Sequence, residues 1–174
     1  MKLILKFSTL AFAFLTILSC DAIDDLTEFN INDDFTTTFN VSVEEAPMSF
    51  NETATISIAS NQEIQDNIDL IQNVTINAIT YEISNFTGAE GAIVTEASLN
   101  IGNSNIAVAD INLLQSDTDN TVYTIENSST FTDIGNTLQN DTSITASVTG
   151  TVNNVPVAFN VVVTIDVTVT IDVL

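Results

Sequence analysis

The sequence predicts a mainly β protein, a two-sheet antiparallel β-sandwich with two short helices. Three observations predict this fold class. Apolar and polar residues alternate over many short segments, which is typical of half-buried strands. Residues that favour turns separate these segments, and two stretches with helical spacing interrupt them. A closed barrel with an apolar lumen stays open as the alternative architecture.

The predicted strands of the N-terminal half follow Asp34. Between Phe35 and Val43 the odd positions are mostly apolar, and the even positions carry Thr, Asn or Ser. The same alternation returns near residues 54–58 and 93–101, and each segment predicts a strand with one buried face. Between residues 74 and 83 the apolar phase shifts by one residue, which predicts a bulge or a crossing between sheets. Further short apolar runs cover residues 106–114 and 122–125.

Two segments have the spacing of helices. Ser60 to Glu63 has the pattern of a capping box, and apolar residues then recur at helical intervals. This pattern predicts a helix over residues 61–72, with Ile64, Ile68 and Ile71 on one face. Thr130 to Asp133 repeats the signature and predicts a second helix over residues 129–139, with Phe131, Ile134 and Leu138 on one face.

The last alternating segment is the longest. From Val155 to Val173 every odd position is apolar, so one face of a long strand is continuously hydrophobic. The preceding segment, residues 144–152, alternates in the same way, and Asn153-Asn154 separates the two runs with residues that tolerate turns. We therefore predict a hairpin in which Gly150 pairs with Val157 and Val148 with Phe159. Beyond Ile165 the last strand needs other partners, most naturally in the middle of a sheet.

The N-terminus has the three parts of an export signal. Lys2 and Lys6 give a positive start, residues 7–18 are apolar, and Ser19 is small. The apolar stretch has about a dozen residues, whereas a span of the bilayer needs about 20. The segment therefore predicts a cleaved signal rather than a membrane anchor.

Residues 15–20, Leu-Thr-Ile-Leu-Ser-Cys, resemble a bacterial lipobox. The resemblance implies that Cys20, the single cysteine of the chain, is lipidated and becomes the first residue after cleavage. An acidic cluster at Asp21, Asp24 and Asp25 resembles the surface-export signal of lipoproteins in some Gram-negative lineages. We therefore expect an outer-membrane lipoprotein displayed on the cell surface, with an inward-facing lipoprotein as the alternative. The expected organisation is a signal peptide at 1–19, a lipidated acidic tether at 20–34 and a sandwich domain at 35–174.

Composition excludes several classes of function. The chain has 23 acidic residues, two lysines, no arginine, no histidine and no tryptophan. A catalytic triad, a cysteine nucleophile, a lysine Schiff base and a histidine zinc site all require residues that the mature chain lacks. Nucleic acid is excluded as a partner because no cation would neutralise its phosphates. We expect no enzymatic activity, and a carboxylate-dependent hydrolase is the alternative that two carboxylates in one cleft would support.

Calcium is the one metal that the composition favours, because it takes oxygen ligands from Asp, Asn and carbonyl groups. The best candidate ligands are Asp117, Asp119 and Asn120, in a predicted loop before Val122. Asp33 and Asp34 are a second choice. No other cofactor is expected.

The expected function is that of a binding or structural module, and recognition of a protein or a glycan by the sandwich is the expected activity. Tyr81 and Tyr123 could form part of a sugar-binding surface, although each falls in a strand pattern that favours a core role. The rival function is a pilin-like assembly subunit whose long last strand completes the sheet of a neighbour.

Overall fold

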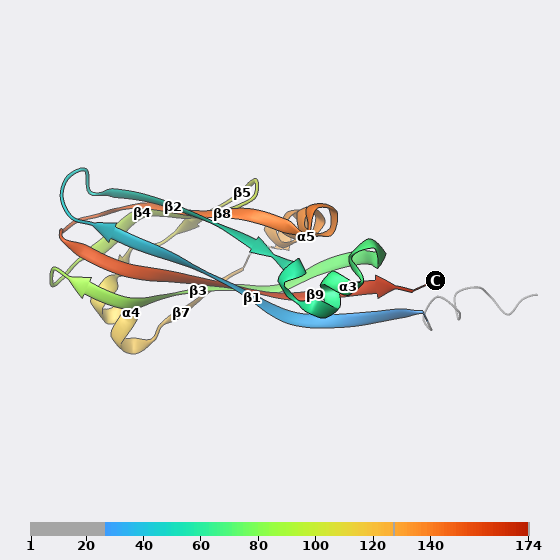
Figure 1. The fold of residues 1–174 in the computed structure, drawn as a ribbon. Helices are drawn as coiled ribbons and strands as arrows, with labels where there is room; N and C mark the ends of the chain where they lie inside the picture. The colour runs from blue at the N-terminus through green and yellow to red at the C-terminus, as the bar shows by residue number, and fades with distance from the viewer. Residues whose placement is uncertain (1–26, 127, 174) are drawn as a thin grey trace, which may run out of the picture.

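The computed structural model describes residues 27–126 and 128–173, which form two packed antiparallel sheets (Figure 1). The first sheet has the order β1-β9-β3-β7, with strands Glu28–Val43, Val157–Asp172, Ile71–Gly88 and Val122–Ile125. The second sheet has the order β2-β8-β4-β5, with strands Ser49–Ser57, Ser143–Val152, Ile93–Ile101 and Ser104–Val108, and β6 (Ile111–Asn112) also pairs with β4. The predicted fold class, a β-sandwich with few short helices, is confirmed.

Strand β9 lies in the middle of the first sheet. This position was expected for the part of the last strand beyond Ile165, which the predicted hairpin leaves without a partner. Strand β9 pairs along its whole length with β1, from Asp172 opposite Glu28 to Val157 opposite Val43, and on its other side with β3. Its odd positions are buried and its even positions are partly exposed throughout. The predicted facing of this strand is therefore confirmed.

The predicted hairpin between residues 144–152 and the last strand is wrong. Strands β8 and β9 lie in different sheets, and β8 pairs with β2 and β4 instead. Asn153 does not turn the chain back. Its N–H donates to the carbonyl of Ile93 at 3.1 Å and its Oδ1 accepts from the Ile93 N–H at 2.7 Å. These bonds continue the β8–β4 ladder, and the chain then crosses to the other sheet.

The first strand begins earlier than the sequence predicts. Strand β1 starts at Glu28, so residues 28–34, assigned to the acidic tether, belong to the sandwich. Ile31 and Phe35 are both buried and lie on the same side of the strand. The three residues between them, Asn32, Asp33 and Asp34, are part of the ladder to β9. Pairing along β9 determines this boundary more strongly than the acidic composition does.

The first predicted helix is shorter than expected. Helix α3 covers Gln62–Asp66, and Asn61 caps it by accepting hydrogen bonds from the N–H groups of Glu63 and Ile64. Ser60 is not the cap, because its hydroxyl donates to the carbonyl of Ser57. A 3-10 turn, Ile68–Leu70, follows, and Ile71 already begins β3.

The second predicted helix is confirmed, and a third helix was not predicted. Helix α5 covers Ser128–Asp141, with Ile134 and Leu138 fully buried. Helix α4 covers Leu113–Asp119, capped by Asn112, whose Oδ1 accepts from the Gln115 N–H. No helix among the described residues combines the length and apolar character that a membrane crossing requires.

The phase shift predicted in residues 74–83 is a real irregularity of β3. Its register with β9 shifts between Ile76 and Ala78. The residue between them, Asn77, turns its amide outward and donates to Asp166 at 2.9 Å and Thr168 at 3.0 Å.

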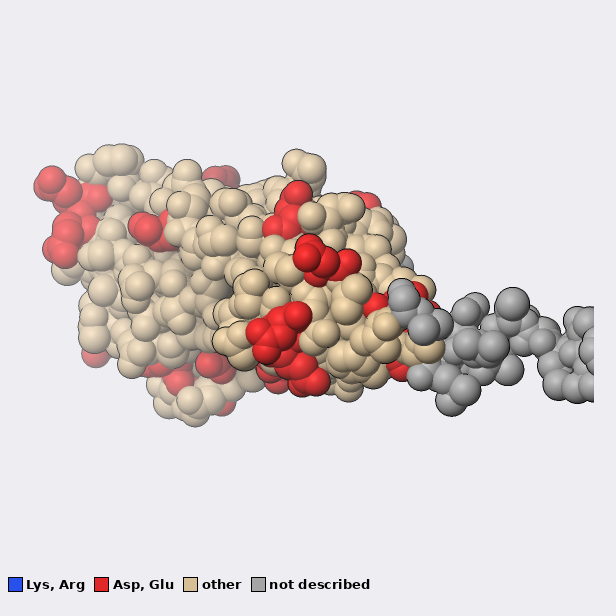
Figure 2. All heavy atoms as spheres, turned by 45° about the vertical axis from the view of Figure 1, so that its right-hand side comes forward, with Lys and Arg blue, Asp and Glu red and all other residues tan. Residues whose placement is uncertain are grey.

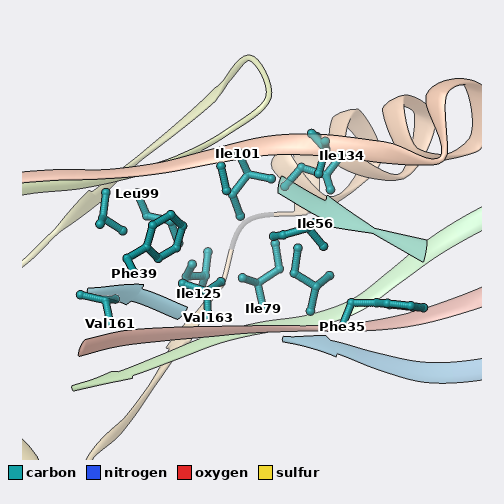
Figure 3. Close-up of a cluster of buried hydrophobic side chains, with 14 of the residues drawn as sticks. Phe35, Phe39, Ile56, Ile79, Leu99, Ile101, Ile125, Ile134, Val161 and Val163 are labelled. Atoms are coloured by element: carbon teal, nitrogen blue, oxygen red, sulfur yellow. The ribbon is translucent and has the colours of Figure 1, made fainter. Parts of the chain in front are cut away.

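The core lies between the two sheets and is filled by branched aliphatic and phenylalanine side chains. Figure 3 shows side chains from the two sheets meeting in this layer, with Phe39 directed toward Leu99 and Ile134 of α5 above one end. Phe50 of β2 also reaches across the core and contacts the ring of Phe159 of β9. Gly150, opposite Phe50 in the ladder, leaves room for the Phe50 ring, because a Cβ there would lie 2.8 Å from Cζ of Phe50.

Candidate functional site

The predicted lipidation site lies outside the described residues. Cys20, the signal segment 1–19 and the N-terminal part of the tether all precede Thr27, the first described residue. Strand β1 begins at Glu28 beside the last residues of β9, so the chain enters the sandwich at the end where β9 finishes (Figure 1). The loops that join β1 to β2, β3 to β4 and β8 to β9 lie at the opposite end.

The candidate calcium ligands do not lie in a loop. Asp117 and Asp119 belong to helix α4, and Asn120 ends that helix in the left-handed conformation, with φ 48° and ψ 50°. Oδ2 of Asp117 accepts a hydrogen bond from the N–H of Phe86 at 3.3 Å, so this carboxylate ties α4 to β3. In residues 27–126 and 128–173 no three His, Cys, Asp or Glu side chains gather closely enough to hold a metal ion. The candidate set contains two such residues and one asparagine, so calcium binding stays a prediction.

The second-choice aspartates lie on opposite faces of β1. Asp33 follows the buried Ile31 in the alternation and points inward, while Asp34 is exposed. The Asp33 carboxylate accepts from Nδ2 of Asn61 at 2.6 Å and from the N–H of Asp34 at 2.9 Å. Both aspartates line a polar cleft of about 290 Å³ between β1 and β2. The hydrogen bonds give Asp33 a structural role in fixing α3 against β1.

Hydrogen bonds between neutral side chains connect the outer face of the first sheet. Three pairs join β1 to β9: Thr36 with Thr164 at 3.1 Å, Asn32 with Thr168 at 2.7 Å and Asn30 with Thr170 at 2.9 Å. The described residues include no Lys or Arg, and the view in Figure 2 shows acidic side chains scattered over a largely uncharged surface. This ladder gives cross-strand contacts that do not need a cation.

Tyr81 and Tyr123 are brought together by the pairing of β3 and β7. They are direct cross-strand partners, and their rings stack at a centroid distance of 4.9 Å and an angle of 10°. The Tyr123 hydroxyl donates to Oγ of Ser116 at 3.2 Å. Burial raises the pKa of Tyr81, and the neighbouring charge of ionised Tyr123 adds to the shift. The paired rings therefore close one side of the sandwich, and because they stack on each other they do not offer a free aromatic face for a sugar.

Tyr81 also separates two hollows on that side of the sandwich. Outside it lies a cleft of about 320 Å³, lined by residues of β5 and β7 with Ala109 and Glu126. Inside it lies an apolar cavity of about 30 Å³ between the sheets, bordered by Phe159, Leu99 and Val148 among others. The cavity is too small for an organic ligand, since about one water molecule would fill it. The outer cleft is the larger and more accessible of the two.

Sequence reasoning missed the cleft between β5 and β7. The apolar run at residues 106–114 contains its β5 wall, and the run at 122–125 forms its β7 wall. Their proximity follows from each strand being the last of its own sheet, which depends on the pairing of all the other strands. No local pattern in the sequence carries that information.

The described residues lack several of the side chains that enzymes use for catalysis. They contain no His, Cys, Lys or Arg, so no nucleophile and base of those types can be paired within them. The cleft between β5 and β7 has a single carboxylate in its lining, Glu126. A carboxylate-dependent hydrolase needs two.

Comparison with known proteins identifies no family. No protein-family model matches the chain, and no curated protein matches it. The chain is similar to a solved structure of desmodium yellow mottle tymovirus, with 11% identity, 84% of each chain covered and a TM-score of 0.38. It is also similar to the capsid protein of a BFDV 60-mer, with 8% identity, 85% of this chain and 97% of that chain covered and a TM-score of 0.36. Similarity this weak supports no functional argument, and the protein is assigned to a fold class, the β-sandwich, rather than to a family.

Proposed function

We propose that the protein is a lipid-anchored surface module whose β-sandwich binds a protein or a glycan. The observation that carries the proposal is the N-terminal pattern, a charged start, a short apolar stretch and the single cysteine at position 20. Strand β1 begins at Glu28, so only a short segment separates this cysteine from the first strand. An anchor at Cys20 would hold the sandwich close to the membrane by the end where β9 finishes.

A binding role agrees with the chemistry of the described residues. The cleft between β5 and β7 has the mixed apolar and polar lining of a recognition site. The sequence from residue 27 to residue 173 contains no His, Cys, Lys or Arg. We therefore propose a non-enzymatic role.

The arrangement of β9 is unfavourable to the pilin-like alternative. A strand donated to a neighbour must leave its own sheet, and β9 is hydrogen-bonded along both edges to β1 and β3. Releasing it would break the centre of the first sheet and expose its buried odd positions. An exposed edge, not this central strand, is the better means of recognising a partner.

Lipidation is tested with Cys20→Ala in the native host. The full chain should partition into the detergent phase, and the variant, once its signal is cleaved at another site, should appear in the aqueous phase. Cys20→Ser should behave in the same way, because it keeps a small polar residue but cannot carry the thioether. Unchanged membrane retention of both variants after cleavage of the signal would reject the anchor.

Surface display is tested separately by adding protease to intact cells. The anchored chain should be digested without lysis, while a periplasmic marker survives. Protection of the chain until the outer membrane is broken would favour an inward-facing lipoprotein.

A further inference from the structure

The two sheets leave a pair of free strand edges on the same side of the molecule. Strand β5 is the last of its sheet and β7 the last of the other, and both border the cleft that contains Ile106 and Ile125. Backbone hydrogen bonds outside the regular ladders are found in several loops, but none among the described residues involves β5 or β7. The outer edges of both strands thus have unpaired backbone groups.

The turn before β5 shows which backbone groups point outward. Gly102 and Asn103 form a two-residue connection between Ile101 and Ser104, with φ 58° at Gly102, which corresponds to a type II′ hairpin. The closing pair of such a hairpin is hydrogen-bonded, and the bonded pairs alternate along an antiparallel ladder. The N–H and C=O groups of Asn105 and Ala107 are therefore directed away from β4.

The opposite side of the sandwich is protected, whereas this side is not. The long edge strand β1 carries Asp33 on its inward face, and inward-pointing charges on edge strands discourage the addition of another strand. Neither β5 nor β7 contains a charged residue. Val122 of β7 is 58% exposed, the highest exposure of any large apolar side chain among the described residues.

The shape and lining of the cleft fit an extended chain. Side chains alternate along β5, with Ile106 and Val108 half-buried toward the core and Asn105 and Ala107 exposed. A strand added to β5 would place every second side chain against Ile125 and Tyr81 in the cleft. Its backbone would satisfy the outward groups of Asn105 and Ala107.

We propose that the free edge of β5 binds an extended, positively charged segment of another protein as an added strand. The charge of the occupant follows from the charges at the cleft. Glu126 lines the cleft, Asp110 is the next residue after the lining residue Ala109, and no Lys or Arg occurs among the described residues. A second copy of the chain, or its own segment 21–25 with three aspartates, would bring further negative charge. This inference rests on the binding role proposed above but does not depend on the lipid anchor.

The test uses the full chain in detergent and three synthetic peptides as probes. The parent peptide is Lys-Val-Thr-Val-Thr-Val-Lys, and two derivatives carry N-methyl groups either on all valines or on all threonines. Because one edge of a strand uses the N–H groups of alternate residues, one derivative should bind like the parent and the other should not. Binding of the parent should shift and protect the amide signals of Asn105 and Ala107 in NMR and hydrogen exchange. Equal binding of both derivatives would overturn strand addition.

Charge and position are tested with further probes and variants. A peptide with Glu in place of both Lys residues should bind about tenfold more weakly at low salt, and equal binding would overturn the requirement for positive charge. Ala107→Pro removes an outward N–H from an exposed position and should abolish binding, while Ala107→Ser keeps the N–H and should retain it. If Ala107→Pro does not fold, the methylated peptides still decide the question.

Other occupants would give distinct results. Protection of β1 amides by the peptide would place the site on the wrong edge. Concentration-dependent association of the full chain without peptide, lost in Ala107→Pro, would make a second copy the occupant and overturn the proposal. If none of the peptides binds, the proposed site on β5 is rejected. The detergent partition of Cys20→Ala does not depend on peptide binding, so failure of this site and failure of the lipid anchor are distinguishable.

Discussion

Phe50 and Phe159 meet edge to face across the core, with ring centroids 5.7 Å apart and planes at 88°. They come from β2 and β9, strands that belong to different sheets. The contact therefore connects the two layers of the sandwich. It also depends on Gly150, because the Phe50 ring occupies the space that a side chain at that position would need.

Phe159→Asp should destabilise the fold by about 3–5 kcal/mol, because the contact with Phe50 is lost and a charge is placed in the core. Asn160→Asp, on the other face of β9, adds the same charge where the side chain is partly exposed and should cost about 0.5 kcal/mol or less. Urea unfolding of both variants measures the difference. Equal tolerance would mean that the assigned facing of β9 is incorrect.

Gly150→Ala should cost about 1–2 kcal/mol, because its Cβ would force the Phe50 ring out of its position against Phe159. Replacing Phe50 with Leu removes the atoms that would clash, so Gly150→Ala should cost less in the Phe50→Leu background. A double-mutant cycle measured by thermal or urea unfolding tests this coupling. Additive effects would show that Gly150 acts independently of the ring.

Asp33→Thr should make the chain associate at raised protein concentration, since the long edge of β1 loses its inward charge. Asp34→Thr changes the net charge by the same amount on the exposed face and should leave the chain monomeric. Sedimentation at several concentrations compares the two. If both variants associate alike, loss of net charge rather than loss of edge protection is responsible.

Stability should fall as the pH rises above about 10, because the pKa of Tyr81 is raised from its ordinary value of 10.0 by burial and then by Tyr123. The unfolded chain loses the Tyr81 proton first, so the stabilisation is complete below pH 10 and is lost as the pH rises through the higher pKa of the folded chain. Denaturant unfolding at alkaline pH measures the decline, and Tyr81→Phe should reduce it. An unchanged decline in that variant would assign it to other groups.

Calcium binding at Asp117, Asp119 and Asn120 predicts a higher melting temperature in calcium chloride than in magnesium chloride of equal ionic strength. Asp119→Asn should remove the difference. Sodium chloride alone should also stabilise the chain from a low starting level, because screening weakens repulsion among carboxylates that have no cation nearby. Equal effects of the two divalent ions would leave only such screening.

The sequence predicts the burial of strand faces better than it predicts strand neighbours. Alternation in β9 correctly identifies the odd positions as buried, but a continuous apolar face can lie beside another such face or opposite it across a core. Val148 and Phe159, expected to be cross-strand partners, instead line the same core cavity from opposite sheets. Two asparagines between two amphipathic strands were consistent with a hairpin, yet Asn153 prolongs β8 along β4.

The errors of sequence-based prediction at the candidate sites have a similar physical origin. Asp117 and Asp119 were assigned to a loop because their surroundings are polar, whereas Asn112 begins a helix that the short apolar run did not reveal. The cleft between β5 and β7 arises only when both sheets are complete. Helix α5, by contrast, has apolar residues at helical spacing along one face, and this local signal was sufficient.

The position of β9 between β1 and β3 determines the order in which the molecule can become stable. Glu28 pairs with Asp172, near the end of the described chain, so the whole of β1 lacks its partner until β9 has been synthesised. Pairing over such long separations is slow, because the chain must close a large loop before the new contacts form. A nascent chain without β9 therefore cannot complete the first sheet. If the chain is exported as we propose, late completion of this kind would leave the polypeptide unfolded during passage through an export channel, and the stable sandwich would form only on the far side of the membrane.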